Sequence, residues 1–156
     1  MRRRGHRVEV LDGDEVRRTL SADLGFSRED REENIRRIAC LAASLADRGA
    51  VVLVAAIAPY RATRRELRER FESFVEVYVN APLATCIARD PKGLYRLALA
   101  GEIGCFTGIG DPYEPPFAPD IECNTDRETV EQSARKLVRA LDRILEARQE
   151  PAYVTG

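Results

Sequence analysis

With 156 residues, 44% of them hydrophobic and 33% charged, the chain has the size and composition of one soluble globular domain. Its 25 basic and 26 acidic side chains leave a net charge of -1, which gives no electrostatic reason to expect nucleic-acid or membrane binding. Neither a signal peptide nor an apolar run long enough to span a bilayer is present, so we expect a cytoplasmic protein. Four scattered cysteines without a C-x-x-C pair favour reduced thiols over a zinc site or disulfides.

Strand and helix patterns alternate along the chain. A short strand is predicted from Arg7 to Leu11, and a helix from Ser27, as its N-cap, to Arg48. The continuous apolar run from Ala50 to Ile57 predicts a strand that is buried on both faces. The remaining expected elements are a charged helix at 62–70, a strand at 74–79, a short helix from Pro82, a long loop at 101–119, an edge strand near Ile121 and an amphipathic helix at 128–147.

This alternation predicts an α/β fold with three layers, α/β/α, and a mostly parallel sheet. We expect a single domain over residues 1–148 and a flexible tail over residues 149–156. In such sheets, ligands bind outside the carboxyl ends of the strands. Asp12-Gly13-Asp14 and the segment from Ile57 to Tyr60 both follow predicted strands, so a site is expected there.

An acidic pair follows the first predicted strand. Asp12 and Asp14 are carboxylates one residue apart, which can share a cation or hold a base near a hydroxyl group. Arg17, one helical turn later, can bind an anionic group through two parallel hydrogen bonds. The same residues also suit an Asp-Gly turn followed by a capped helix, and this segment alone does not decide between the two interpretations.

Two further segments carry residues suited to a nucleotide. Phe26, Arg31 and Asn34 bring together an aromatic plane, a guanidinium and an amide, which suit a base, a phosphate and a ribose. A run of charges at a helix start is also typical of a solvated surface with ion pairs. Lys92 and Phe106 belong to the stretch rich in glycine and proline, which predicts a mobile flap over a phosphorylated ligand.

Six short strings, followed by YEPP, occur in a fixed order: LDGDEVR, DLGFSREDREENIRR, IAPYR, RDPKGLY, GEI and FTGI. Because it contains these strings in this order, the chain resembles the adenylylsulfate (APS) kinase family from about Gly5 to Leu145. The resemblance implies a P-loop-kinase-like fold and transfer of the γ-phosphoryl group of ATP, with Mg2+, to the 3′-hydroxyl of APS, giving PAPS. A non-catalytic kinase-like module that binds APS or PAPS is the alternative hypothesis.

The resemblance also implies a role for each matching position. Asp12 is similar to the catalytic carboxylate that orients or deprotonates the 3′-hydroxyl, and Asp14 to its catalytic support or metal ligand. Arg89 matches a position near the adenine of ATP. The implied substrate contacts are Arg17, Phe26, Arg31, Asn34, Ile57, Lys92 and Phe106.

The sequence departs from the family pattern at three places. Leu99, Gly104 and Cys105 replace more basic lid positions, so weaker phosphate contacts are expected there. Ala58 stands where the family usually has serine, which excludes a phosphoserine intermediate. No G-x-x-x-x-G-K-[ST] sequence, whose amides and lysine cradle the ATP phosphates, occurs in the 156 residues. The resemblance therefore implies a kinase truncated at its N-terminus, without the first strand, the P-loop and the first helix, and with impaired transfer. The resemblance also allows two kinds of partner. One is a second copy of the chain in a homodimer, and the other is ATP sulfurylase, by association or by fusion.

Overall fold

A computed structural model describes residue 2 and residues 5–149 of the chain, with side chains described as far as residue 146. The chain forms two compact units. The first contains the described residues up to Phe74 together with Arg89–Phe117, and the second contains Val75–Ala88 and the described residues from Ala118 onward. The single domain over residues 1–148 stays a prediction. Gln149 ends the last helix, and the rest of the predicted tail lies outside the described residues.

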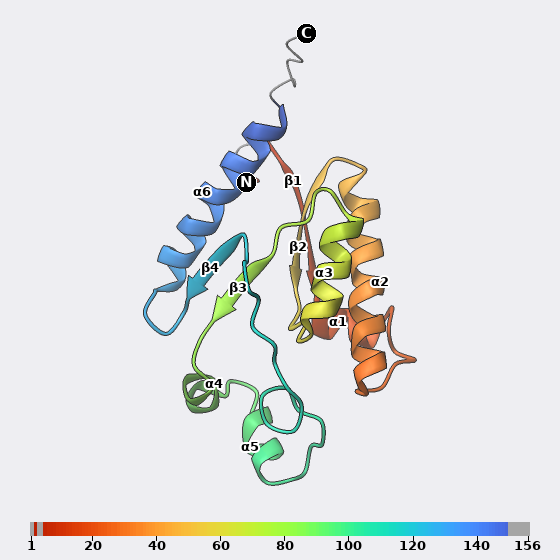
Figure 1. The fold of residues 1–156 in the computed structure, drawn as a ribbon, viewed down its shortest axis with the longest axis vertical. Helices are drawn as coiled ribbons and strands as arrows, with labels where there is room; N and C mark the ends of the chain where they lie inside the picture. Colours follow the sequence, from red (N-terminus) through yellow and green to blue (C-terminus); the bar gives the residue numbers. More distant parts are fainter. Residues whose placement is uncertain (1, 3–4, 150–156) are drawn as a thin grey trace. The chain divides into compact units, whose positions relative to one another are not determined.

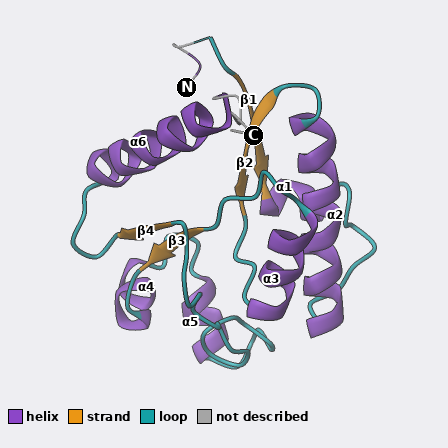
Figure 2. Ribbon diagram, turned by 45° about the horizontal axis from the view of Figure 1, so that its top comes forward, coloured by secondary structure: helices purple, strands orange, loops and turns teal. Residues whose placement is uncertain are grey.

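The first unit is built on a pair of parallel strands, β1 (Arg7–Asp12) and β2 (Ala50–Ala55). Their register runs from Arg7 opposite Ala50 to Asp12 opposite Ala55. The connection contains α1 (Gly13–Arg18) and α2 (Arg28–Ala46), and α3 (Arg61–Arg70) follows β2. Helix α2 contacts both strands and α3 (Figure 1, Figure 2). The short helix α5 (Leu94–Leu99), which the sequence analysis did not predict, belongs to the same unit.

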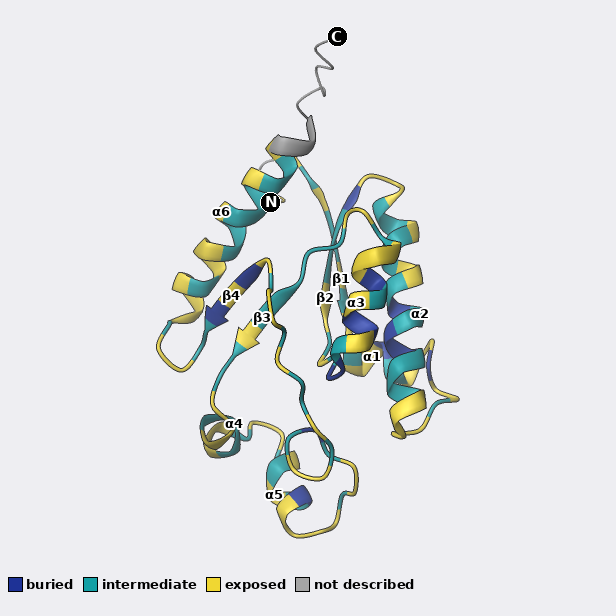
Figure 3. Ribbon diagram, in the orientation of Figure 1, coloured by how far each residue is buried: buried dark blue, intermediate teal, exposed yellow. Residues whose placement is uncertain are grey.

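A small apolar core fixes these helices around the strands. Val16 of α1, Ile35 and Ile38 of α2, and Leu67 of α3 form one buried cluster. Figure 3 marks buried residues on all three helices. The predicted N-cap of α2 is confirmed, because Ser27 Oγ accepts a hydrogen bond from the Asp30 amide at 3.1 Å. The cap and the core therefore fix where α2 begins and which face it buries.

The predicted burial of β2 on both faces is wrong. The strand ends at Ala55, and of its residues only Ala50 is buried. Val54 is 44% exposed, and Val10 of the neighbouring strand is 57% exposed. The apolar run identified the strand correctly, but burial of both faces needs an element packed over each face as well as neighbouring strands. In the described residues β2 pairs with β1 alone, and α2 is the helix that packs against it in the first unit.

The second unit contains another parallel pair, β3 (Val77–Asn80) and β4 (Ile121–Asn124). Helix α6 (Val130–Gln149) contacts β4, and α4 (Leu83–Arg89) follows β3. The strand near Ile121 and the final amphipathic helix are confirmed, whereas β3 begins later than predicted. None of the helices in the described residues is long and apolar enough to cross a membrane.

Both strand pairs are parallel and both units mix helices with strands, so the predicted α/β class and strand direction are confirmed. The strands form two separate two-stranded sheets in the described residues rather than the one predicted sheet. The carboxyl ends of β1 and β2 lie side by side, with Asp12 opposite Ala55. This arrangement places the two predicted site segments at one edge of the first sheet.

Candidate functional site

Asp12 links the end of β1 to the start of α1. Its Oδ1 accepts hydrogen bonds from the amides of Asp14, at 2.8 Å, and Glu15, at 3.3 Å, so Asp12 is the N-cap of α1. Gly13 allows α1 to begin beside β2, because a Cβ atom there would lie 3.0 Å from the carbonyl oxygen of Ala55. The capped-helix interpretation is thus confirmed, and the cap fixes the orientation of the carboxylate.

Asp14 forms an ion pair with Lys92, which precedes α5. This carboxylate raises the pKa of Lys92, through its hydrogen bond and then through its charge. Asp12 and Asp14 line a shallow open pocket together with Glu15 and residues of the following turn. Because both partners of the ion pair are largely exposed, the pair contributes little stability, but it brings Lys92 to the acidic end of β1.

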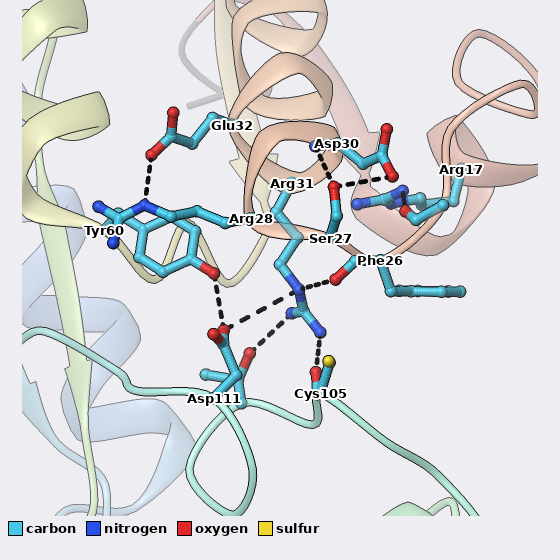
Figure 4. A network of polar contacts seen from close by, with 12 residues as sticks. Arg17, Phe26, Ser27, Arg28, Asp30, Arg31, Glu32, Tyr60, Cys105 and Asp111 are labelled. Atoms are coloured by element: carbon cyan, nitrogen blue, oxygen red, sulfur yellow. Dashed lines mark hydrogen bonds and ion pairs between the residues drawn. The ribbon is translucent and has the colours of Figure 1, made fainter.

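Two arginines approach the ring of Phe26, which is 66% exposed (Figure 4). The Cζ atom of Arg17 lies 5.0 Å from the ring centroid, and that of Arg31 lies 5.8 Å from it. Burial lowers the pKa of Arg17, and the positive charge of Arg31 lowers it further, although Asp30 raises it. Two like charges beside one aromatic ring favour binding of an anion next to that ring.

Arg31 also connects the start of α2 to the loop after α5 (Figure 4). Its Nε donates to the carbonyl oxygen of Phe26 at 2.9 Å, and its Nη1 donates to Thr107 Oγ1 at 2.8 Å. Nη2 donates to the carbonyl oxygen of Cys105. Phe106 stands between these two loop residues in the sequence, so Arg31 holds the segment that carries the second predicted aromatic.

Phe106 packs against Tyr95 of α5, with ring centroids 5.0 Å apart and an interplanar angle of 81°. This edge-to-face contact is a favourable arrangement for two aromatic rings. It joins the loop to the helix that follows Lys92. The predicted flap is therefore held at both Arg31 and Tyr95 in this structure.

Asn34 lies in α2, close to one turn after Arg31, and is only 6% exposed. Its Oδ1 is one of three buried side-chain oxygens without a hydrogen-bond partner in the described residues, and the other two are hydroxyls of Ser21 and Thr63. An unpaired buried acceptor costs about 1–3 kcal/mol, and native proteins usually avoid this cost. The unpaired amide oxygen of Asn34 therefore carries a cost that a hydrogen-bond donor beside it would remove.

Ile57 and Ala58 follow β2 directly. Ile57 is 62% exposed, and Ala58 has a φ of 42°, in the left-handed region that non-glycine residues seldom adopt. The carbonyl oxygen of Ala58 accepts a hydrogen bond from Arg64 Nη1 at 2.6 Å. Arg64 of α3 therefore holds this backbone segment in its unusual conformation.

Sequence analysis missed a contact between Tyr60 and Asp111, in which the phenol donates to Asp111 Oδ2 at 2.8 Å. Tyr60 is 1% exposed, and the guanidinium of Arg28 lies 4.4 Å from its ring centroid. Burial, followed by the hydrogen bond, raises the pKa of Tyr60 to about 12, so the phenol remains a donor at neutral pH. The string IAPYR contained Tyr60, but no local pattern indicated its partner.

The structure thus brings together three small groups of predicted residues: Asp14 with Lys92, Arg17 and Arg31 with Phe26, and Phe106 with the loop that Arg31 holds. Helix α1 carries both Asp14 and Arg17, which places the first two groups on one short helix. Arg89 is the exposed last residue of α4, and its position near ATP stays a prediction. The roles of all these residues in binding or catalysis likewise stay predictions.

Comparisons with known proteins point to one family. A family model described as adenylylsulphate kinase matches residues 1–124. The adenylyl-sulfate kinase of Microcystis aeruginosa is 59% identical over 133 residues, which cover 85% of this chain and 74% of that protein. The adenylyl-sulfate kinase of Gloeothece citriformis is 54% identical over 144 residues, which cover 92% of this chain and 82% of that protein.

A solved structure gives the same result at the level of the fold. The APS kinase CysC of Mycobacterium tuberculosis, in complex with AMPPNP and APS, matches with a TM-score of 0.84 and 45% identity. The match covers 90% of this chain and 83% of that chain. It confirms the fold class predicted from the sequence.

Proposed function

This chain belongs to the adenylylsulphate kinase family, and on that basis we propose that it binds APS and orients the ribose 3′-hydroxyl for phosphorylation to PAPS. The phosphoryl donor of this family is ATP. A non-catalytic module is not favoured, because relatives that match 85% and 92% of the chain are named as kinases. The observation that carries the proposal is that the guanidinium groups of Arg17 and Arg31 both approach the ring of Phe26.

The substrate side of the site has a side chain suited to each part of APS. The guanidinium groups of Arg17 and Arg31 suit its phosphosulfate, because arginine binds such oxyanions through paired hydrogen bonds. Phe26 and Phe106 supply aromatic surfaces for adenine, a contact worth about 1–3 kcal/mol per base. The unpaired Oδ1 of Asn34 suits a donor on the base or the ribose.

Asp12 is the residue that we propose to contact the 3′-hydroxyl of APS, which accepts the phosphoryl group. Two amides hold its Oδ1, which fixes the carboxylate, and its Oδ2 is the oxygen that would accept the proton of the 3′-hydroxyl. Lys92 holds Asp14 beside it, at the same end of β1. The carboxylates therefore orient the hydroxyl, while the arginines hold the anionic part of the substrate.

Mg2+ fits this donor set only together with nucleotide phosphates. Within the described residues no group of three or more His, Cys, Asp or Glu side chains could hold a metal ion by itself. Magnesium in kinases is usually bound by one or two carboxylates plus phosphate oxygens, and Asp12 and Asp14 can supply the carboxylates. Bound there, the ion would neutralise charge on the phosphates. The 156 residues contain no G-x-x-x-x-G-K-[ST] sequence, so we assign no residue of this chain to the ATP phosphates.

Calorimetric titration of the chain with APS and with AMP tests the proposal. AMP lacks the sulfate, so we expect it to bind at least tenfold more weakly than APS, because it forms fewer charge-assisted hydrogen bonds with the two arginines. Circular dichroism of the same samples establishes that the chain is folded. Equal affinities for the two nucleotides, or a folded chain that binds neither, would contradict the proposal.

Four expectations from the sequence stay predictions. They are the cytoplasmic location, the homodimer, the association or fusion with ATP sulfurylase, and the place of Arg89 near ATP.

A further inference from the structure

Tyr60 holds the carboxylate of Asp111 from a nearly inaccessible position. The tyrosine follows β2 at the edge of the sheet that carries the candidate site, and it is 1% exposed. Its hydroxyl donates to Asp111 Oδ2 at 2.8 Å (Figure 4). A buried hydroxyl that is paired in this way restricts where the carboxylate oxygen can lie.

The same carboxylate oxygen faces Arg31. Asp111 Oδ2 lies 4.0 Å from Arg31 Nε, at the outer limit of an ion pair, and both side chains are mostly buried. Hydrogen-bonded ion pairs between arginine and carboxylate are usually about 2.7–2.9 Å long. Asp111 thus places a negative charge near Arg31 without forming a hydrogen-bonded ion pair with it.

The N–H groups of Arg31 donate hydrogen bonds to residues other than Asp111. Its Nε donates to the carbonyl oxygen of Phe26 at 2.9 Å, and its Nη1 donates to Thr107 at 2.8 Å. A carboxylate that moved onto the guanidinium would compete with these contacts and with any anionic ligand. The distance between Asp111 and Arg31 therefore controls how much positive charge Arg31 can offer to such a ligand.

Asp111 also closes the turn that carries the second aromatic of the site. Its amide donates to the carbonyl oxygen of Phe106 at 3.1 Å, and its own carbonyl oxygen accepts from the Gly108 amide at 2.7 Å. One residue therefore affects both the turn from Phe106 to Asp111 and the surroundings of Arg31.

We propose that Tyr60 and Asp111 are positioning residues of the APS site. Tyr60 holds the Asp111 carboxylate away from a close ion pair with Arg31, which leaves the N–H groups of Arg31 that do not hold the loop and Phe26 available to the anionic substrate. The inference rests on the proposed function, since APS is taken as the ligand. Neither residue contacts the substrate in this account. Both act through Arg31 and the turn that contains Phe106.

Titration of APS into three variants tests this relation. Without the hydroxyl, in Tyr60→Phe, the carboxylate closes on Arg31, and we expect APS to bind about tenfold more weakly. Asp111→Asn removes the competing charge but keeps an acceptor for Tyr60, so its affinity stays within about threefold of the unchanged chain. In the double variant the loss is rescued, and APS affinity returns to that of Asp111→Asn. Independent, additive losses in the double variant would overturn the proposal.

A second pair of variants leaves Tyr60 intact and covers the case in which Tyr60→Phe does not fold. Asp111→Glu extends the carboxylate toward Arg31, and we expect APS affinity to fall about fivefold or more relative to Asp111→Gln. These two side chains have nearly the same size, so the difference measures charge alone. Equal affinities of the two variants would refute the inference.

Thermal melting separates positioning from a merely structural role. Removal of a hydroxyl from Tyr78, on β3 in the other unit, is the matched control, and Tyr78→Phe should leave APS affinity unchanged. If Tyr60→Phe lowers the melting temperature but leaves APS affinity unchanged, Tyr60 is structural and the inference fails. If the unchanged chain does not bind APS at all, the proposed function fails first, so the two failures are distinguishable.

Discussion

Replacement of Arg31 by alanine is expected to weaken APS binding by about 100-fold, the largest effect that we anticipate for a single residue. A hydrogen bond to a charged group contributes about 1.5–3 kcal/mol, and about 1.4 kcal/mol corresponds to a factor of ten in affinity. Arg31 also holds the loop through Thr107 and the carbonyl oxygen of Cys105, so the variant loses the anchor of Phe106 as well. Calorimetric titration with APS measures the loss.

Arg65→Ala is the matched control for this experiment. Arg65 lies on α3 with a side chain that is 76% exposed, and it pairs with Glu69 at 3.8 Å. Exposed pairs of this kind contribute about 0–1 kcal/mol, so the control should bind APS as the unchanged chain does. Arg31→Lys should fall between the two, because lysine keeps the charge but lacks the planar fork of donors. An Arg31→Ala chain that is folded and retains full APS affinity would exclude Arg31 from the site.

Replacement of Asn34 by leucine is expected to have opposite effects on stability and on binding. The free chain should become more stable by about 1–3 kcal/mol, because leucine keeps the same branching at Cγ and removes an unpaired buried acceptor. APS affinity should fall about tenfold or more, because the oxygen that would pair with the ligand is gone. Urea denaturation gives the first quantity and APS titration the second.

Asn80→Leu provides the contrast for Asn34. The side-chain amide of Asn80, on β3, donates to Glu122 Oε1 at 2.8 Å and to Asn124 Oδ1 at 3.3 Å. Leucine at this position would therefore remove the donor of two acceptors that are paired in the unchanged chain. This variant should therefore lose stability and keep its APS affinity. If Asn34→Leu instead lost stability without any change in APS affinity, Asn34 would be an ordinary structural amide.

Much of the first unit could be predicted because its signals are local. Ser27 and Asp30 are three residues apart, and their hydrogen bond is the expected N-cap of α2. Gly49, with a φ of 80°, follows the end of that helix as predicted. The strand at Ala50–Ala55 was found from its apolar run. In each case, the residues that determine the structure lie within a few positions of one another.

The contacts that organise the site join distant parts of the sequence. Lys92 meets Asp14 across 78 positions, and Tyr60 meets Asp111 across 51. Helical or strand periodicity carries no information about such pairs, because the fold brings them together. The family resemblance selected Lys92 and Asp14 as site residues, although it did not predict that they pair. It gave no role to Tyr60 or Asp111, which is why only the structure revealed their contact.

The resemblance also could not foresee the burial pattern of β2. Its valines predict a strand, but burial depends on what covers each face and each edge. Val54 is exposed in this structure, in contrast to the prediction, and Val10 of the neighbouring strand β1 is exposed as well. Sequence pattern therefore identified the element correctly, while its environment had to be observed.

The central claim is that Arg17, Arg31, Asn34 and Phe106 contact one APS molecule. A crystal structure of the chain grown with saturating APS is the most direct test. We expect the phosphosulfate within hydrogen-bond distance of both guanidinium groups, a donor of the nucleotide paired with Asn34 Oδ1, and the adenine against Phe106. APS bound at another surface, such as the depression on α2 lined by Arg36, Arg37 and Cys40, would contradict the account.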